Sequence, residues 1–214
     1  MGITSAGLLA KFARLNPAIW PMQVVAYLMV LAALFLVARK FKYSDRIVAA
    51  ILAFFWIWNA LVFFLPATSA LSYVLAAAFI VQGILFLVGV AKPSVAYRFG
   101  MDIFSLAGIV LILYALIGYP LVGYAIGHIY PRAVFVGTFP CPTAVVTFGL
   151  FLCTESKVPK YLLVIPLLFA LFGILLASVG MGEDVGMVVG GLLATAMIVY
   201  RDRTVMRGAA YHPV

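Results

Sequence analysis

The stretch AVFVGTFPCPTAVVTFGLFLC, residues 133–153, decides how many times this chain crosses a lipid bilayer. It contains no charged side chain, and its length matches the roughly 20 apolar residues that a helix needs to cross the hydrocarbon core. Pro140 and Pro142 interrupt it, because proline removes a backbone donor and clashes with the preceding turn of a helix. The stretch is either an irregular span or a segment that dips into the bilayer and returns.

The composition of the whole chain is that of a protein surrounded by lipid. The 214 residues are 67% hydrophobic and 9% charged, with a mean hydropathy of +1.23. A soluble domain carries about 25% charged residues, so this chain has too few polar side chains to cover a water-facing surface. Segments of strictly alternating hydrophobicity, typical of a β-barrel, do not occur. Because helices satisfy their own backbone in lipid, the sequence predicts an all-α, polytopic transmembrane helix bundle, a single domain over residues 1–214.

Seven apolar segments are long enough to be spans. A possible interfacial helix over residues 1–16 precedes them, and residues 201–214 form a predicted cytoplasmic tail. The predicted spans are residues 20–37, 47–65, 70–90, 103–119, 133–153, 161–178 and 185–200.

The distribution of the 14 lysines and arginines decides between seven and six spans. With seven spans, three basic residues lie on the N-terminal side of the membrane and eleven on the other side. If residues 133–153 only dipped into the bilayer, the division would be eight against six, which is almost no bias. Because basic residues are enriched in cytoplasmic loops, the sequence predicts seven spans, with the N-terminus outside and the C-terminus in the cytoplasm. The three are Lys11, Arg14 and Arg132; the eleven are Arg39, Lys40, Lys42, Arg46, Lys92, Arg98, Lys157, Lys160, Arg201, Arg203 and Arg207.

The net charge of +8 follows from this asymmetry and does not indicate a nucleic-acid surface. Basic residues on the cytoplasmic side of a membrane contact anionic lipid headgroups. The expected partners are therefore the lipid bilayer and a small solute, with further copies of the chain or a larger membrane complex as open alternatives and no nucleic acid. The expected location is the cytoplasmic (inner) membrane of a prokaryote.

The Pro-Cys-Pro-Thr break, residues 140–143, predicts a ligand site. Pro142 suits the first position of a helix that continues from Thr143, with Cys141 as its cap. Residues 133–142 would then be irregular backbone, which is tolerated at membrane depth only where it is buried in protein or lines a wet cavity. The free N–H groups at the start of such a half-helix attract anions. The alternative is that the prolines only shape a corner of the chain.

Polar side chains close to this break, or on the same predicted side of the membrane, are the candidate ligand-binding residues. His128 and Cys141 are also the candidate ligands of a metal, because imidazole and thiolate bind metals. Arg132 could pair with Glu183 or Asp184, although these two acids are equally well placed to cap the last span. His128, Tyr130 and Arg132 could instead serve only as interface anchors. The candidates are His128, Tyr130, Arg132, Cys141, Thr143, Glu183 and Asp184.

Four motifs are spread along the chain: Asn-Pro-Ala-Ile-Trp-Pro at 16–21, Trp-x-Trp at 56–58, Tyr-Pro at 119–120 with Gly-His-x-Tyr-Pro at 127–131, and Pro-Cys-Pro-Thr at 140–143. Together they resemble the motifs of a family of prokaryotic multi-pass membrane proteins known as a domain of unknown function. The resemblance covers nearly the whole chain and implies a membrane-embedded protein, without supplying an activity. Where the family carries a Tyr-His pair, this chain has Phe63-Phe64, so a two-histidine metal or haem site would lack one ligand.

Three functions fit the sequence. A transporter or channel for a small solute is favoured, because interrupted helices at mid-membrane often build substrate sites. The alternatives are a membrane-embedded enzyme or a metal or thiol site that uses Cys141 and His128, and an accessory subunit of a membrane complex. The sequence does not identify a cofactor, but it argues against two: residues 185–200 contain no lysine that could hold retinal, and the position of His212 in the predicted tail argues against a bis-histidine haem.

Overall fold

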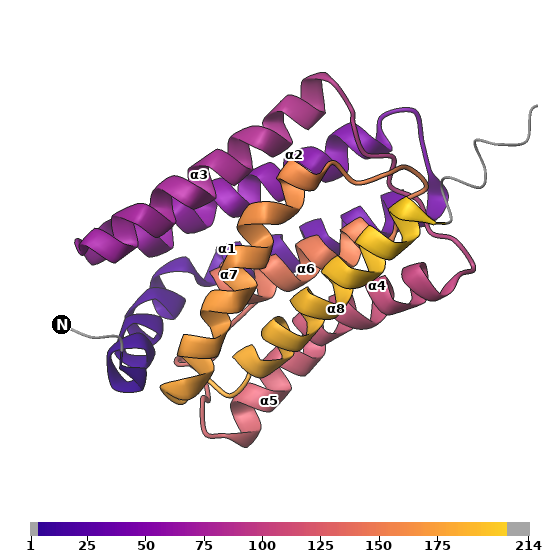
Figure 1. Ribbon diagram of the computed structural model, residues 1–214. Helices are drawn as coiled ribbons and strands as arrows, with labels where there is room; N and C mark the ends of the chain where they lie inside the picture. Colours follow the sequence, from indigo (N-terminus) through magenta and orange to yellow (C-terminus); the bar gives the residue numbers. More distant parts are fainter. Residues whose placement is uncertain (1–3, 205–214) are drawn as a thin grey trace, which may run out of the picture.

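The computed structural model describes residues 4–204 and confirms the all-α fold class (Figure 1). Within these residues six helices are long and apolar enough to cross a bilayer, and one shorter apolar helix accompanies them. This part of the chain forms no strand, only an isolated antiparallel bridge between Tyr97 and Thr154. The helices are α1 (Ser5–Arg39), α2 (Ser44–Trp58), α3 (Ala70–Ala91), α4 (Ile103–Leu113), α5 (Tyr119–Ala125), α6 (Pro140–Leu152), α7 (Lys160–Ser178) and α8 (Asp184–Arg203).

Two of the six long helices contain a π-helical segment. α2 continues through the π-helical residues Asn59–Phe64 and a 3₁₀ turn, Leu65–Ala67. α4 continues through the π-helical residues Tyr114–Gly118 into α5. Because a π-helical turn widens the repeat, it shifts the following side chains around the helix axis, and such turns are frequent at functional sites. Both segments end beside the cavity described below.

The chain runs between two ends of the bundle. At the end that we call the Tyr97 end, the loop after α3 forms the bridge between Tyr97 and Thr154 with the segment after α6. At the opposite end, which we call the His128 end, the loop after α5 contacts the start of α8 through His128 and Glu183. α6 starts near the His128 end and finishes at the Tyr97 end, so residues 133–153 cross the bundle and do not return. The placement of the Tyr97 end in the cytoplasm stays a prediction.

The short helix α6 occupies the centre of the bundle (Figure 1). Of its 13 residues all except Cys141 are buried, and α2, α4, α7 and α8 pack around it. Thirteen residues rise about 20 Å, which is less than the hydrocarbon thickness of about 30 Å. The preceding residues 133–139 are irregular backbone that includes a turn, and Val134 and Val136 in this segment are buried in the bundle. The prediction of irregular backbone inside the protein is thus confirmed for residues 133–139.

α6 begins two residues earlier than the sequence predicts. Phe139 is its N-cap residue and Pro140 its first residue, so the prediction of Cys141 as the cap and Pro142 as the first position is wrong. Both prolines fit into the first turn because the N–H groups of that turn have no acceptor within the helix.

Arg201, in the last turn of α8, donates hydrogen bonds to the free carbonyl groups at the C-terminal end of α6. Its side chain is buried, and Nη1 donates to the carbonyl oxygens of Phe151 and Leu152 at 3.3 and 3.0 Å. A cation at the C-terminus of a helix also suits the helix dipole. The central helix is therefore held at its C-terminal end by a charged side chain from a neighbouring span.

Buried amide side chains donate hydrogen bonds to the backbone carbonyl groups of the irregular segment before α6. Asn16 donates to the carbonyl oxygens of Pro131 and Ala133 at 2.6 and 2.7 Å, and Asn59 donates to that of Gly137 at 3.2 Å. Unpaired backbone groups are costly at membrane depth, so these bonds fix the course of the segment. Gly137 has a φ of +75°, and a Cβ atom there would lie 2.7 Å from neighbouring side-chain atoms, so only glycine fits.

α1 combines two elements that the sequence predicts separately. Of the predicted interfacial helix over residues 1–16, the described part is not a separate helix, because α1 runs unbroken from Ser5 to Arg39. An interfacial position for its first turns stays a prediction. Its 35 residues rise about 50 Å, more than the bilayer requires. Pro17 and Pro21 lie inside it, and its first turns are set at an angle to the rest (Figure 1). Residues 1–3 and 205–214, with His212 and most of the predicted tail, lie outside the described residues.

Candidate functional site

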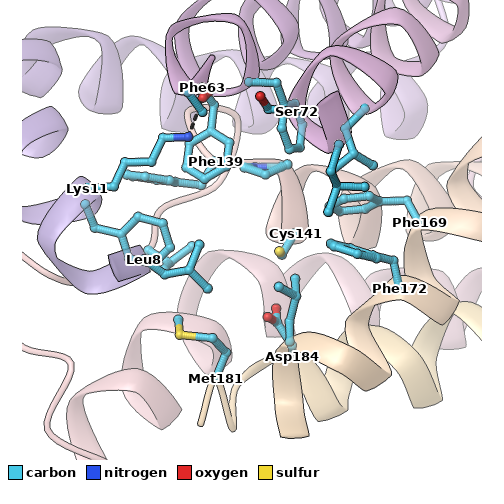
Figure 2. Close-up of a pocket in the computed structure, with 18 of the residues that line it drawn as sticks. Leu8, Lys11, Phe63, Ser72, Phe139, Cys141, Phe169, Phe172, Met181 and Asp184 are labelled. Carbon is cyan, nitrogen blue, oxygen red and sulfur yellow. Dashed lines mark hydrogen bonds between the residues drawn. The ribbon is translucent and has the colours of Figure 1, made fainter. Parts of the chain in front are cut away.

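A cavity of about 150 Å³ lies at the His128 end, beside the first turn of α6 (Figure 2). It is lined by the first turns of α1, the junction of α2 and α3, the second half of α7 and the start of α8. Its wall is mostly aromatic and aliphatic, with a few polar groups, which is the usual make-up of a small-molecule site. The rings are those of Phe12, Phe63, Phe64, Tyr119, Phe139, Phe169 and Phe172, and the other polar side chains are Lys11, Ser69, Ser72, Cys141 and Asp184.

Asp184, the first residue of α8, brings a carboxylate to this wall. The residue is 2% exposed, and the hydroxyl of Tyr119 donates to its Oδ1. Its Oδ2 accepts no hydrogen bond from residues 4–204, and the carboxylate points towards the same space as the Cys141 sulfur (Figure 2). The predicted capping role is not formed, because neither Asp184 nor the N-cap residue Glu183 makes a side-chain bond to the helix terminus.

Glu183 and His128 form a second buried contact next to the cavity. Nδ1 of His128 lies 2.9 Å from Oε1 and 3.2 Å from Oε2 of Glu183, and both side chains are less than a tenth exposed. The N–H of His128 donates to the carbonyl oxygen of Gly123 at 2.8 Å, which fixes the histidine directly after α5. The hydroxyl of Tyr114 donates to the carbonyl oxygen of Glu183 at 2.7 Å. The pair therefore ties the loop after α5 to the start of α8.

Arg132 does not form the predicted ion pair with these acids. Its side chain is exposed, and it has no carboxylate within 4.0 Å in the described part of the chain. The position is taken by His128, because the chain leaves α5 with His128 turned inwards and reaches Arg132 at the surface. Tyr130 is likewise exposed.

The two cysteines lie at opposite ends of α6 and are both free. The Cys141 sulfur lies at the wall of the cavity, whereas Cys153 is fully buried, with Sγ 3.6 Å from the carbonyl oxygen of Ser105. Thr143, a further candidate, does not line the cavity. Its hydroxyl donates to the carbonyl oxygen of Phe139 at 2.7 Å and accepts from Asn59 at 3.3 Å, which serves the fold.

The structure therefore sorts the seven candidates into three groups. Cys141 and Asp184 line the cavity, and His128 and Glu183 pair beside it. Tyr130, Arg132 and Thr143 lie apart from its wall. A ligand-binding role for any of them stays a prediction.

The expectation of a metal or an anion at the start of α6 gains no support from this geometry. Residues 4–204 contain no group of three or more His, Cys, Asp or Glu side chains arranged to hold a metal, so a site on His128 and Cys141 would need ligands from elsewhere. Pro140 and Pro142 also remove two of the N–H groups that would attract an anion at this terminus.

Lys11 and Tyr119 belong to the wall and were missed by the sequence analysis as site residues. Lys11 Nζ donates to the carbonyl oxygen of Phe63 and lies 3.6 Å from the centre of the Phe63 ring. An ionisable residue in an apolar helix marks a functional site by default, and this signal in Lys11 was available. No comparable signal was available for Tyr119, because its contact is with a residue 65 positions away.

Comparison with known proteins gives a family and no activity. The model of a family of unknown function (DUF6064) matches residues 7–209, which is nearly the whole chain. No curated protein and no solved structure matches. The resemblance inferred from the sequence motifs, to an uncharacterised family, is thereby confirmed.

Proposed function

The chain belongs to the DUF6064 family of unknown function, and we propose that it is an integral membrane protein that binds a small solute in the cavity beside α6 and carries it across the bilayer. The outer surface of the bundle supports a location in lipid. Along α1, Val24, Leu28, Leu31 and Phe35 are each more than half exposed and lie on one face of the helix. A continuous apolar surface of this kind is stable against lipid and unstable in water.

The cavity beside the interrupted helix is the observation that carries the proposal. α6 starts inside the bundle, and an irregular segment replaces the helix on the His128 side of it. Membrane transporters commonly bind their substrates where a helix is interrupted in this way. A cavity with aromatic walls and one carboxylate can hold a small solute at that point.

We further propose that the cavity loads from the outer side of a prokaryotic cytoplasmic membrane. Of the eleven basic residues that the sequence assigns to one side, the ten that lie within residues 4–204 are found at the Tyr97 end or at the ends of the helices that meet there. The cavity lies at the opposite end. Since basic residues favour the cytoplasm, the cavity would lie in the outer half of the bilayer.

The two alternative functions are supported less. An enzyme that uses Cys141 with His128 would require the two side chains to share a site, but His128 pairs with Glu183 and is not part of the cavity wall. An accessory subunit would need no cavity of this kind, and recovery of a stoichiometric partner with the purified protein would favour it.

Solute uptake by liposomes that contain the purified protein tests the proposal. The panel consists of radiolabelled solutes of suitable size: methylammonium, small neutral amino acids, short carboxylates and polyols. At least one class should enter faster than it enters empty liposomes. The variant Cys141→Phe, which places a ring in the cavity, should abolish the excess uptake, and Cys141→Ala, which changes the same position without filling the space, should retain it. Uptake equal to empty liposomes for every class, or undiminished uptake by Cys141→Phe, would contradict the proposal.

A further inference from the structure

We propose that the solute is a small organic ammonium ion, whose N–H groups donate to Asp184 and whose apolar part packs against the aromatic wall. The inference rests on the proposed function and deepens it by naming the chemical class that the cavity takes.

The carboxylate of Asp184 lacks a cationic partner among the described residues. It is 2% exposed, accepts one hydrogen bond at Oδ1 from Tyr119 and none at Oδ2 from residues 4–204, and it lies at the wall of the cavity (Figure 2). A buried carboxylate is costly unless it is paired and hydrogen-bonded. A ligand that carries an N⁺–H group supplies both the missing donor and the missing charge.

Lys11 is the one basic side chain among the described residues of the wall, and it does not neutralise Asp184. Its Nζ is directed to the carbonyl oxygen and the ring of Phe63, and no carboxylate of residues 4–204 lies within 4.0 Å of it. The two side chains come from different parts of the wall (Figure 2). The carboxylate of Asp184 therefore remains available to a ligand.

The aromatic wall suits the rest of such a ligand. The rings of Phe63 and Phe139 are 5.8 Å apart, and those of Phe12 and Phe139 are 5.0 Å apart, so they form one cluster on the side of Lys11. Ring faces attract ammonium ions, and Lys11 already places its ammonium group over Phe63. The wall thus accommodates cationic as well as apolar groups.

The volume limits the size of the ligand to about one ring or a short branched chain. An apolar cavity of about 150 Å³ is known to accept benzene, and this cavity has the same volume. Small anions are disfavoured, because Asp184 faces the cavity and the two prolines at the start of α6 remove N–H donors. Benzylammonium is therefore a suitable probe, and benzyl alcohol and benzoate are its neutral and anionic counterparts.

Binding of the three probes to the purified full-length protein in detergent, measured by calorimetry at equal free concentration, tests the class. Benzylammonium should bind most tightly, with benzyl alcohol next and benzoate weakest. Asp184→Asn should lower the affinity for benzylammonium about tenfold or more, because a hydrogen bond to a charged group is lost. The affinity of the same variant for benzyl alcohol should stay within about twofold of that of the unaltered protein. Glu155→Gln removes an equal charge at the exposed Tyr97 end and should change none of the three affinities.

The outcomes separate this inference from the proposed function. Equal binding of benzyl alcohol and benzylammonium by the unaltered protein, or preference for benzoate, overturns the ammonium class and leaves a solute-binding cavity. Undiminished benzylammonium binding by Asp184→Asn overturns the role of the carboxylate. If Asp184→Asn no longer binds benzyl alcohol either, the cavity of this variant has collapsed. The order of the three affinities in the unaltered protein then decides whether the ligand is an ammonium ion. Failure of all three probes, together with uptake equal to empty liposomes, removes the cavity site itself.

Discussion

The hydroxyl of Tyr119 donates to the carboxylate of Asp184 inside the bundle, and this contact joins α5 to the start of α8. The two residues are 65 positions apart in the sequence and are 1% and 2% exposed. The contact lies directly at the wall of the cavity, so the site and the packing of the two spans depend on the same hydrogen bond.

Loss of the Tyr119 hydroxyl should destabilise the protein. Tyr119→Phe leaves the Asp184 carboxylate without a donor from residues 4–204, so we expect the free energy of unfolding in detergent to fall by about 1–3 kcal/mol. The exposed Tyr124 offers a matched control, and Tyr124→Phe should change the value by less than about 0.5 kcal/mol. Equal effects of the two variants would show that the buried hydroxyl contributes nothing.

The contact between His128 and Glu183 should be energetically coupled. In a double-mutant cycle with His128→Ala and Glu183→Ala, we expect a coupling energy of about 1–3 kcal/mol, because both side chains are buried and in contact. The exposed pair Arg98 and Glu155, 3.1 Å apart, provides the comparison and should couple by less than about 1 kcal/mol. A coupling energy of zero between His128 and Glu183 would mean that the two side chains are neighbours without interacting.

The two cysteines should differ in reactivity. A small maleimide should modify Cys141, which lies at the cavity wall, and should leave the fully buried Cys153 unmodified until the protein unfolds. Mass spectrometry of the native protein reads out the site directly, and Cys141→Ser should remove the label. Modification of Cys153 in the native protein would contradict the central, closed position of α6.

The orientation in the membrane can be tested in cells with a membrane-impermeant maleimide. In a Cys141→Ser background, Tyr130→Cys introduces an exposed thiol at the His128 end and Lys157→Cys one at the Tyr97 end. If the Tyr97 end is cytoplasmic, intact spheroplasts should label the first variant, and the second should be labelled only after permeabilisation. The reverse pattern would invert the predicted topology and place the cavity in the inner half of the bilayer.

Two glycines with positive φ separate backbone strain from crowding. Gly137 and Gly127 have φ values of +75° and +91°, but a Cβ atom would lie 2.7 Å from side-chain atoms at Gly137 and would meet nothing within 4 Å at Gly127. Both alanine variants carry the backbone cost, and Gly137→Ala adds overpacking of about 1–3 kcal/mol. Thermal denaturation in detergent should therefore show a larger loss of stability for Gly137→Ala than for Gly127→Ala. Equal losses of stability in the two variants would show that the loop before α6 accommodates the added Cβ atom at no energetic cost.

The fold class and the approximate positions of the spans could be predicted from the sequence, because both follow from averages over many residues. The long apolar runs and the asymmetry of basic residues need no knowledge of which side chains meet. The start of α6 was misplaced because Pro140 and Pro142 both fit a first turn, and the sequence does not say which one opens it.

The contacts of the candidate site were less predictable. Capping by Glu183 and Asp184 is the local interpretation of two acids before a helix, but their partners, His128 and Tyr119, are 55 and 65 residues away. Lys11 was assigned to an interface because its apolar neighbours do not reveal that α1 lies against Phe63. Such distant pairings are decided by packing and leave no pattern in a single sequence.

The central position of α6, with four other helices packed around it, has a consequence for the biogenesis of the protein. A segment of 13 residues is too short to be released into the bilayer as an independent helix, and two of the helices that enclose it, α7 and α8, are synthesised after it. Arg201, which holds its C-terminal end, leaves the ribosome about fifty residues later. The central helix therefore reaches its final place only when the C-terminal third of the chain has been translated, and truncation before α8 should leave it without a stable position in the membrane.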